Sequence, residues 1–94
     1  KIFFKMKIKL ELFGASRDLS NNEFLELNFE KKSSIKELRK TIINYVDQNF
    51  KGNENLKKII ETSAFCSEDN NIISENYQIN KDQKIGIIPP IGGG

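Results

Sequence analysis

The sequence predicts an α+β domain in which one main helix packs on a mixed sheet of four to five strands. Three patterns support this prediction. Apolar and polar residues alternate over 7–13 and again over 25–30, which indicates two half-buried strands. Apolar residues recur at helical spacing over 35–46. Residues 85–88 are almost entirely apolar, which is typical of a central strand buried on both faces.

Composition and charge are those of a small globular domain. The 94 residues suffice for one hydrophobic core, and the 37% hydrophobic and 30% charged residues are not those of a disordered chain. The net charge of +2 gives no electrostatic reason to expect nucleic-acid binding. No apolar run approaches the roughly 20 residues that span a bilayer, and no secretory signal pattern is present. Cys66 is the only cysteine, so we expect no disulfide and a cytoplasmic location.

The first strand starts next to Met6. We therefore expect a single domain over 6–94, with 1–5 as an upstream extension or a tag remnant. One face of this strand is charged and the other is apolar, formed by Ile8, Leu10 and Leu12. Residues 18–22 supply a turn. The second strand, with Leu25, Leu27 and Phe29 on one face, is most simply the hairpin partner of the first.

A capping box marks the start of the main helix. Ser34 and Glu37 have the spacing at which the hydroxyl and the carboxylate each accept a hydrogen bond from an amide at the helix N-terminus. About four turns of helix are expected to lie across the sheet. The apolar face that would contact the sheet consists of Ile35, Leu38, Ile42, Tyr45 and Val46.

Shorter elements are expected after the main helix. In order, they are a loop over 51–55, a short helix around Leu56, Ile59 and Ile60, a third strand over 64–66, a fourth over 72–73 or 77–79, and a polar turn over 80–83. An N-terminal hairpin, one helix and a C-terminal central strand together describe the β-grasp, or ubiquitin-like, architecture. The order of elements also fits other α+β folds, so these patterns alone give the class.

The chain has few residues arranged for catalysis. It contains no His, the commonest general base and metal ligand, so neither a Cys–His nucleophile pair nor a thiolate zinc site is expected. Cys66 stands in a predicted strand, where a buried cysteine acts as a small hydrophobic residue. The adjacent carboxylates of Glu68 and Asp69 are typical of a polar turn. No glycine-rich loop precedes a helix. We therefore expect no autonomous catalysis and no metal site.

The C-terminal segment is the remaining candidate for chemistry. Pro89 and Pro90 end the last strand, because proline fixes φ and cannot donate a ladder hydrogen bond. The diglycine Gly93-Gly94 has no side chains, so it can enter a narrow channel in a partner and leave its final carboxylate accessible. The Gly94 carboxylate is then a handle offered to another protein. The alternative is an inert glycine tail.

Two segments resemble the MoaD-type sulfur carriers, the small subunits of molybdopterin synthase. In that family an apolar strand runs into Pro-Pro, two variable residues and Gly-Gly, and 84–94 has this pattern with Ile91 and Gly92 in the variable places. The segment Leu-Phe-Gly-Ala-Ser-Arg-Asp-Leu over 12–19 is similar to the family's first strand and following loop, with Asp18 where Glu is commoner. The resemblance spans 6–94. Residues 64–71 depart from it, because they lack the usual Ala-Val-Asn-like strand.

The resemblance implies a non-catalytic carrier subunit of a hetero-oligomer. An E1-like adenylyltransferase would use ATP to adenylate Gly94, and a sulfur donor protein would convert the adenylate to a thiocarboxylate. The large subunit of molybdopterin synthase would then receive the tail and pass the sulfur to a pterin precursor during molybdenum cofactor biosynthesis. No cofactor would be bound by the carrier itself. The inserted tail would comprise Pro89, Pro90, Ile91, Gly92, Gly93 and Gly94.

Two residues near the first strand are candidates for the partner interface. Phe13 faces opposite to Leu12, and we hypothesise that its ring and Ile91 belong to a hydrophobic docking surface beside the tail. The alternative is that the following loop covers Phe13. Arg17 is a candidate partner contact, with a loop arginine satisfied within the domain as the alternative.

Two other functions fit the same residues. One is a β-grasp sulfur carrier or ubiquitin-like modifier of another pathway, such as tRNA thiolation or thiazole synthesis. The Pro-Pro pair and the chain length argue against the thiazole carrier. The other is an interaction module whose tail takes no part in chemistry.

Overall fold

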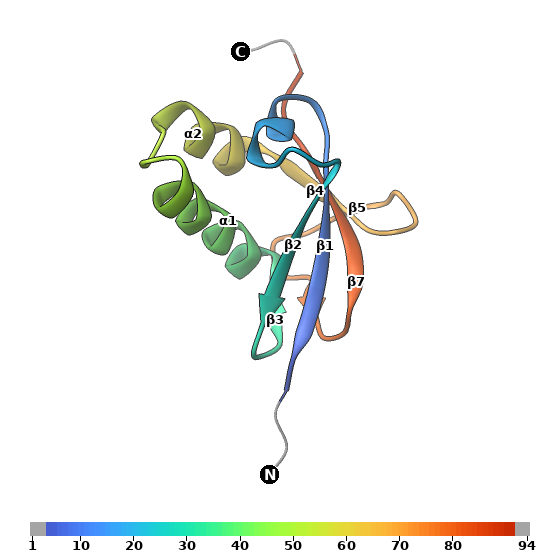
Figure 1. The fold of residues 1–94 in the computed structure, drawn as a ribbon. Coiled ribbons are helices and arrows are strands. Elements are labelled where there is room, and N and C mark those ends of the chain that lie inside the picture. Colours follow the sequence, from blue (N-terminus) through green and yellow to red (C-terminus); the bar gives the residue numbers. More distant parts are fainter. Residues whose placement is uncertain (1–3, 92–94) are drawn as a thin grey trace.

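The computed structural model describes residues 4–91, and over these residues the chain forms a five-stranded mixed sheet with helices on one face (Figure 1). The strand order is β2-β1-β7-β4-β5, and β3 and β6 form a separate short ladder. The elements are β1 (Met6–Leu12), the 3-10 helix η1 (Gly14–Leu19), β2 (Phe24–Phe29), β3 (Ser33–Ser34), α1 (Ile35–Asn49), α2 (Glu54–Thr62), β4 (Ala64–Cys66), β5 (Ile72–Ile73), β6 (Gln78–Ile79) and β7 (Gln83–Ile88).

The central strand β7 runs parallel to β1 and antiparallel to β4. Leu10 lies opposite Ile85 in the parallel pair, and Phe65 lies opposite Ile87 in the antiparallel pair. On its other side β1 pairs antiparallel with β2, as predicted for a hairpin. Because β1 and β7 are parallel, both end at the same edge of the sheet, and this edge carries the start of the C-terminal tail.

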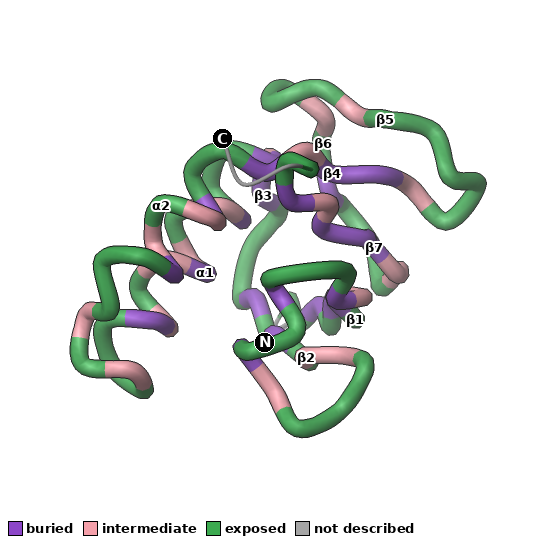
Figure 2. The backbone as a smooth tube through the Cα atoms, turned by 90° about the horizontal axis from the view of Figure 1, so that it is seen from above, coloured by how far each residue is buried: buried purple, intermediate pink, exposed green. Residues whose placement is uncertain are grey.

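The hydrophobic core lies between the sheet and the helices (Figure 2). Alternation sends every second residue of β1 inward, and Ile8 and Leu10 have no exposed surface. Ile85 and Ile87 of β7 are equally buried. From α1 the predicted apolar face supplies Ile35, Leu38, Ile42 and Val46, all at 0% exposure, while Tyr45 lies at the margin of the core.

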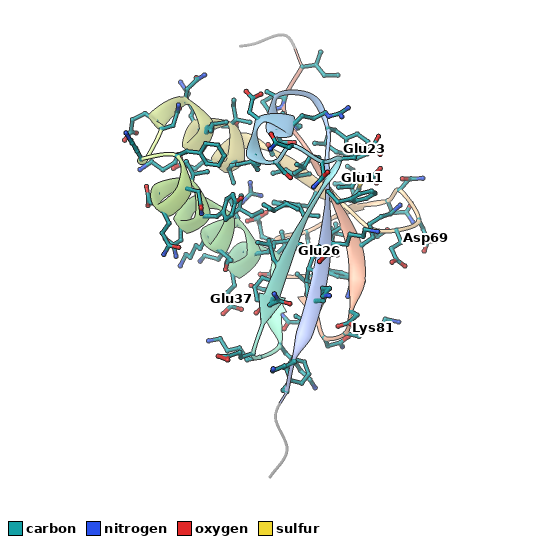
Figure 3. The ribbon with its side chains drawn as sticks, viewed as in Figure 1. Glu11, Glu23, Glu26, Glu37, Asp69 and Lys81 are labelled. Carbon is teal, nitrogen blue, oxygen red and sulfur yellow. The ribbon has the colours of Figure 1, made fainter. Side chains whose placement is uncertain are left out.

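The predicted capping box is present at the start of α1. The Glu37 amide donates to Ser34 Oγ at 3.2 Å, and the Ser34 amide donates to Glu37 Oε1 at 2.9 Å. Hydrogen bonding from the Ser34 backbone lowers the pKa of the Glu37 carboxyl. Figure 3 labels Glu37 at the start of this helix. The box fixes where α1 begins, immediately after β3.

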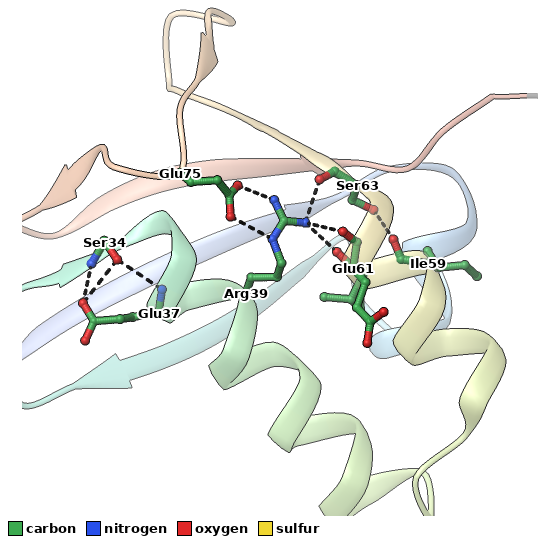
Figure 4. A network of polar contacts seen from close by, with 8 residues as sticks. Ser34, Glu37, Arg39, Ile59, Glu61, Ser63 and Glu75 are labelled. Carbon is green, nitrogen blue, oxygen red and sulfur yellow. Dashed lines mark hydrogen bonds and ion pairs between the residues drawn. The ribbon is translucent and has the colours of Figure 1, made fainter.

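Arg39 connects α1 to the end of α2 and to the segment between β5 and β6 (Figure 4). Its Nη1 donates to the carbonyl oxygens of Ile60, Glu61 and Ser63 at 2.7, 3.1 and 2.8 Å. These groups lie at the C-terminus of α2, where the last carbonyls of a helix lack intrahelical partners. Its Nε and Nη2 bind the Glu75 carboxylate. The guanidinium also lies 4.9 Å from the centre of the Phe65 ring.

The sheet face opposite the helices is charged over one half and apolar over the other. Lys7 pairs with Glu26 at 3.8 Å, and Lys84 pairs with Glu11 at 3.5 Å. Glu11 and Glu26 are labelled over the sheet in Figure 3. Lys9 lies over the Phe24 ring at 4.5 Å from its centre. We call this side of the sheet the open face.

Most predicted elements are confirmed, and several details differ. The short strand β3 was not predicted, Asp18 and Leu19 of the predicted turn belong to η1, and Gln83 belongs to β7 instead of the predicted polar turn. Both candidates for the fourth strand are strands, because β5 pairs with β4 and β6 pairs with β3. The loop over 51–55 is shorter than predicted, since Asn53 caps α2 by accepting from the Leu56 amide at 3.0 Å. The 3-10 helix over 14–19 was not predicted. Its short length leaves too few residues for a periodic pattern.

Candidate functional site at the root of the tail

The candidate site lies at the edge of the sheet where β1 and β7 both end. Beyond β1 the chain turns at Gly14, which has a φ of +54°, and enters η1. Beyond β7 the chain enters the Pro89-Pro90 segment. A Cβ on Gly14 would lie 3.8 Å from Pro89 Cγ, so η1 and the root of the tail are in contact. Figure 1 shows η1, drawn in blue, next to the point where β7 leaves the sheet.

Phe13 lies on the open face at this edge, as predicted from its position after Leu12. Its backbone is extended, with φ −120° and ψ 149°, so it continues the alternation of β1. Its side chain is 41% exposed. The alternative that the following loop covers the ring is therefore wrong.

The backbone of Phe13 is held by the buried Ser16 hydroxyl. Ser16 Oγ accepts from the Phe13 amide at 3.0 Å and donates to the Phe13 carbonyl at 2.6 Å. Ser16 has no exposed surface, so water does not compete for these bonds. The position of the Phe13 backbone is consequently fixed by the first turn of η1.

Gly86 of β7 provides the surface on which the Phe13 ring rests. A Cβ at this position would lie 3.0 Å from Phe13 Cε2 and 2.7 Å from Cys66 Sγ. Cys66 is 5% exposed, and the ring and the thiol together cover Gly86 on the open face of the central strand. The predicted burial of β7 on both faces is therefore met at Gly86, whereas Lys84 and Ile88 on the same face are half-buried.

An apolar area extends from Phe13 across β7, β4 and β5. We call it the open-face patch. Ile72 is 66% exposed and lies opposite Cys66, while Ile88 lies opposite Ala64, so their side chains share this face. The members of the patch are Phe13, Ala64, Cys66, Ile72 and Ile88.

A groove lies on the other side of the root of the tail, between η1 and α2. It has a volume of about 370 Å³. Pro89 is buried in its wall, whereas Pro90 is exposed. We call it the α2 groove. Its lining residues are Ala15, Asn55, Lys58, Ile59, Thr62, Pro89 and Pro90.

The predicted tail residues differ in how they are placed. Pro89 packs into the body of the domain, so the exposed part of the tail begins at Pro90. Ile91 is 98% exposed. The predictions for Gly92, Gly93 and Gly94 concern residues outside the described part of the chain. Phe13 and Pro89 are thus brought to one edge, on opposite sides of the end of β7.

Arg17 lies on the exposed surface of η1. With other residues of 4–91 its side chain forms neither a hydrogen bond nor an ion pair, so it is not the internally satisfied loop arginine of the alternative. Its role as a partner contact stays a prediction.

No group of three His, Cys, Asp or Glu side chains within 4–91 could hold a metal ion. Over the same residues no helix combines the length and apolar character needed to cross a membrane.

Comparison with solved structures identifies the fold. A Pyrococcus furiosus protein provisionally assigned as subunit 1 of molybdopterin converting factor matches with a TM-score of 0.66 and 16% identity, over 92% of this chain and 99% of that chain. The Haloferax volcanii protein HVO 2177 matches with a TM-score of 0.68 and 11% identity, over 96% of this chain and 88% of that chain. No family model and no curated protein matches the sequence. The chain has the ubiquitin-like β-grasp fold, as predicted.

Three parts of the site were missed by the sequence analysis. No sequence pattern indicated the role of Ser16, because a serine hydroxyl in a loop has many possible hydrogen-bond partners. Gly86 was not singled out, although a glycine within a strand often marks a close approach by another group. The α2 groove combines residues from η1, α2 and the tail, so no local pattern could have indicated it.

Proposed function

We propose that this protein is the sulfur-carrier subunit of a molybdopterin synthase and works in the cytoplasm. The observation that carries the proposal is the exposed segment from Pro90 to Ile91, which leaves the central strand of a β-grasp domain and leads into Gly92-Gly93-Gly94. One structural neighbour is provisionally assigned as molybdopterin converting factor subunit 1, which supports the choice of pathway.

The proposed chemistry takes place at the carboxylate of Gly94. An E1-like adenylyltransferase joins this carboxylate to the AMP portion of ATP, and pyrophosphate leaves. A sulfur donor protein then delivers sulfur at the oxidation level of sulfide, which attacks the adenylate carbonyl. A C–S bond forms, the C–O bond to AMP breaks, AMP leaves and Gly94 becomes a thiocarboxylate. The carrier binds no cofactor in this scheme. ATP belongs to the activating enzyme, and the groups that act on the pterin precursor belong to the large subunit.

The length and composition of the tail suit delivery into a buried site. An extended chain advances about 3.1–3.5 Å per residue, so the four residues from Ile91 to Gly94 could reach roughly 12–14 Å beyond Pro90. Glycine loses much conformational freedom when it is ordered, and backbone hydrogen bonds from the partner would offset this cost. The three glycines also need only a narrow channel.

The open-face patch is the proposed docking surface for the large subunit. Exposed apolar side chains grouped on one face mark interaction sites, and this group lies beside the root of the tail. Phe13 supplies an aromatic side chain that already packs on Gly86, and its backbone is held before binding, which lowers the entropic cost of association. Arg17, on the adjacent η1, is proposed as a polar contact at the rim.

The decisive experiment measures intact mass after the protein is incubated with the activating enzyme, ATP and a sulfur donor. The expected shift equals the replacement of one oxygen by sulfur, and fragmentation should locate it at Gly94. A variant without Gly94 is the matched control and should show no shift. An unmodified wild-type chain would support the inert-tail function instead.

A second measurement separates the molybdopterin pathway from other sulfur pathways. The thiocarboxylated protein should restore molybdopterin formation when it is mixed with the large synthase subunit and the pterin precursor. If it is thiocarboxylated but inactive in this mixture, a carrier for tRNA thiolation or another pathway becomes the better proposal.

A further inference from the structure

The α2 groove lies directly beside the tail and has no role in the proposed function so far. Its apolar lining includes half-buried Ile59 and buried Pro89. Its rim is polar, with exposed Asn55, Lys58 and Thr62 from successive turns of α2. The groove therefore offers both apolar contact and hydrogen-bonding groups at its margin.

The charge of the groove has one sign. Lys58 is the cation among the lining residues, and none of the lining residues is acidic. Within residues 4–91 the Lys58 ammonium has no ion-pair partner, whereas the neighbouring Lys57 pairs with Asp47 at 3.0 Å and with Glu54 at 3.6 Å. Opposite charge across an interface favours encounter and correct orientation.

Two of the residues that line the groove belong to the tail itself. Pro89 and Pro90 line it, and Ile91 follows at once. A protein that encloses the tail from Ile91 onward must cover Pro90, and this brings its surface over the groove. The groove is thus continuous with the proposed insertion site but separate from the open-face patch, which lies on the opposite side of β7.

We propose that the α2 groove is a second docking site for the protein that accepts the tail. Its occupant is a segment of that partner which carries an apolar side chain and a carboxylate. The apolar side chain lies on Ile59 and Pro89, and the carboxylate pairs with Lys58. This inference rests on the proposed function, and it means that the partner grips the root of the tail from both sides.

The test measures binding between the full chain and a large synthase subunit. The large subunit serves as the probe, and it is the one encoded in the same genome as this chain. The key variant is Lys58→Glu. Lys81→Glu is the matched control, because it changes the net charge equally and Lys81 lies in the exposed turn before β7, at the other end of the sheet (Figure 3). Association and dissociation rates are measured over a range of salt concentrations, and thermal melting shows that each variant is folded.

The expected result is a rise in Kd of about tenfold for Lys58→Glu, mostly because the variant associates more slowly. High salt should abolish this difference in association rate between the variant and the wild type. Lys81→Glu should stay within about twofold of the wild type. Lys58→Arg should retain wild-type affinity, because it keeps the charge. Equal Kd values for Lys58→Glu and Lys81→Glu, with normal wild-type binding, would overturn this inference alone. Absence of wild-type binding would overturn the proposed function, and the second docking site with it.

Discussion

The Ser16 hydroxyl binds both backbone polar groups of Phe13, donating to its carbonyl at 2.6 Å and accepting from its amide at 3.0 Å. This pair of bonds places the aromatic ring on the open face, next to the point where β7 becomes the tail. The backbone of Phe13, the proposed docking residue, is thus held by the same short helix that contacts Pro89.

Phe13→Asp should weaken binding to the large subunit by tenfold or more, since truncation of a central aromatic anchor typically costs over 1 kcal/mol. The midpoint of thermal unfolding should change little, because the ring is 41% exposed. Phe4→Asp is a suitable control, as Phe4 is 38% exposed and precedes β1 at the opposite edge of the sheet. Titration calorimetry measures both affinities. Equal affinities for the two variants would exclude Phe13 from the interface.

Gly86→Val should lower the free energy of unfolding by about 1–3 kcal/mol through overpacking. The added Cβ alone would lie 2.7 Å from Cys66 Sγ and 3.0 Å from Phe13 Cε2. Adding Cys66→Ala should recover part of this loss, because it removes the nearest atom, and Cys66→Ala alone serves as the reference. Urea denaturation measures all three variants. A Gly86→Val protein as stable as the wild type would show that the open face of β7 is not tightly covered.

Arg39→Met should lower the free energy of unfolding by about 2–4 kcal/mol. It retains an apolar side chain beside Phe65 but leaves the carbonyls at the end of α2 and the Glu75 carboxylate without their donor. Lys40→Met, at an exposed position on the same helix, is the control and should change stability by less than about 0.5 kcal/mol. Chemical denaturation followed by circular dichroism gives both values. Similar losses in the two variants would contradict the connecting role of Arg39.

The capping box should make stability depend on acid pH. The pKa of Glu37 is lowered in the folded protein, chiefly by the hydrogen bond from the Ser34 amide. Its carboxylate therefore stabilises the fold above the ordinary glutamate pKa, and this contribution is lost as pH falls through the lower folded value.

The measurement for Glu37 is the thermal midpoint of the wild type and of Glu37→Gln between neutral pH and about pH 3. Glutamine keeps the hydrogen-bond acceptor without the charge, so the wild type should be more stable at neutral pH and lose its advantage in acid. Parallel curves for the two proteins would show that the charge of Glu37 does not contribute.

The sequence predicted the elements that have a strong period and missed the contacts between distant segments. Alternation identified β1 and β2, and Ser34 and Glu37 located the start of α1 within a residue. The five strands and their order follow less directly, since β5 contains two residues and carries no periodic signal. Among site residues, Phe13 was predicted from alternation alone. Ser16, Gly86 and Lys58 were not, because their roles depend on which segments the fold brings next to β7.

The position of β7 between β1 and β4 has a mechanical consequence. A partner that grips the tail and pulls applies force along the axis of this strand, while hydrogen-bonded ladders hold it on both sides. The force is then distributed over many hydrogen bonds that are loaded in shear at the same time. In an edge strand pulled away sideways, by contrast, the hydrogen bonds would break one after another. Under the proposed function, the protein can thus be pulled out of one enzyme by its tail, before it meets the next, without separation of β7 from the sheet.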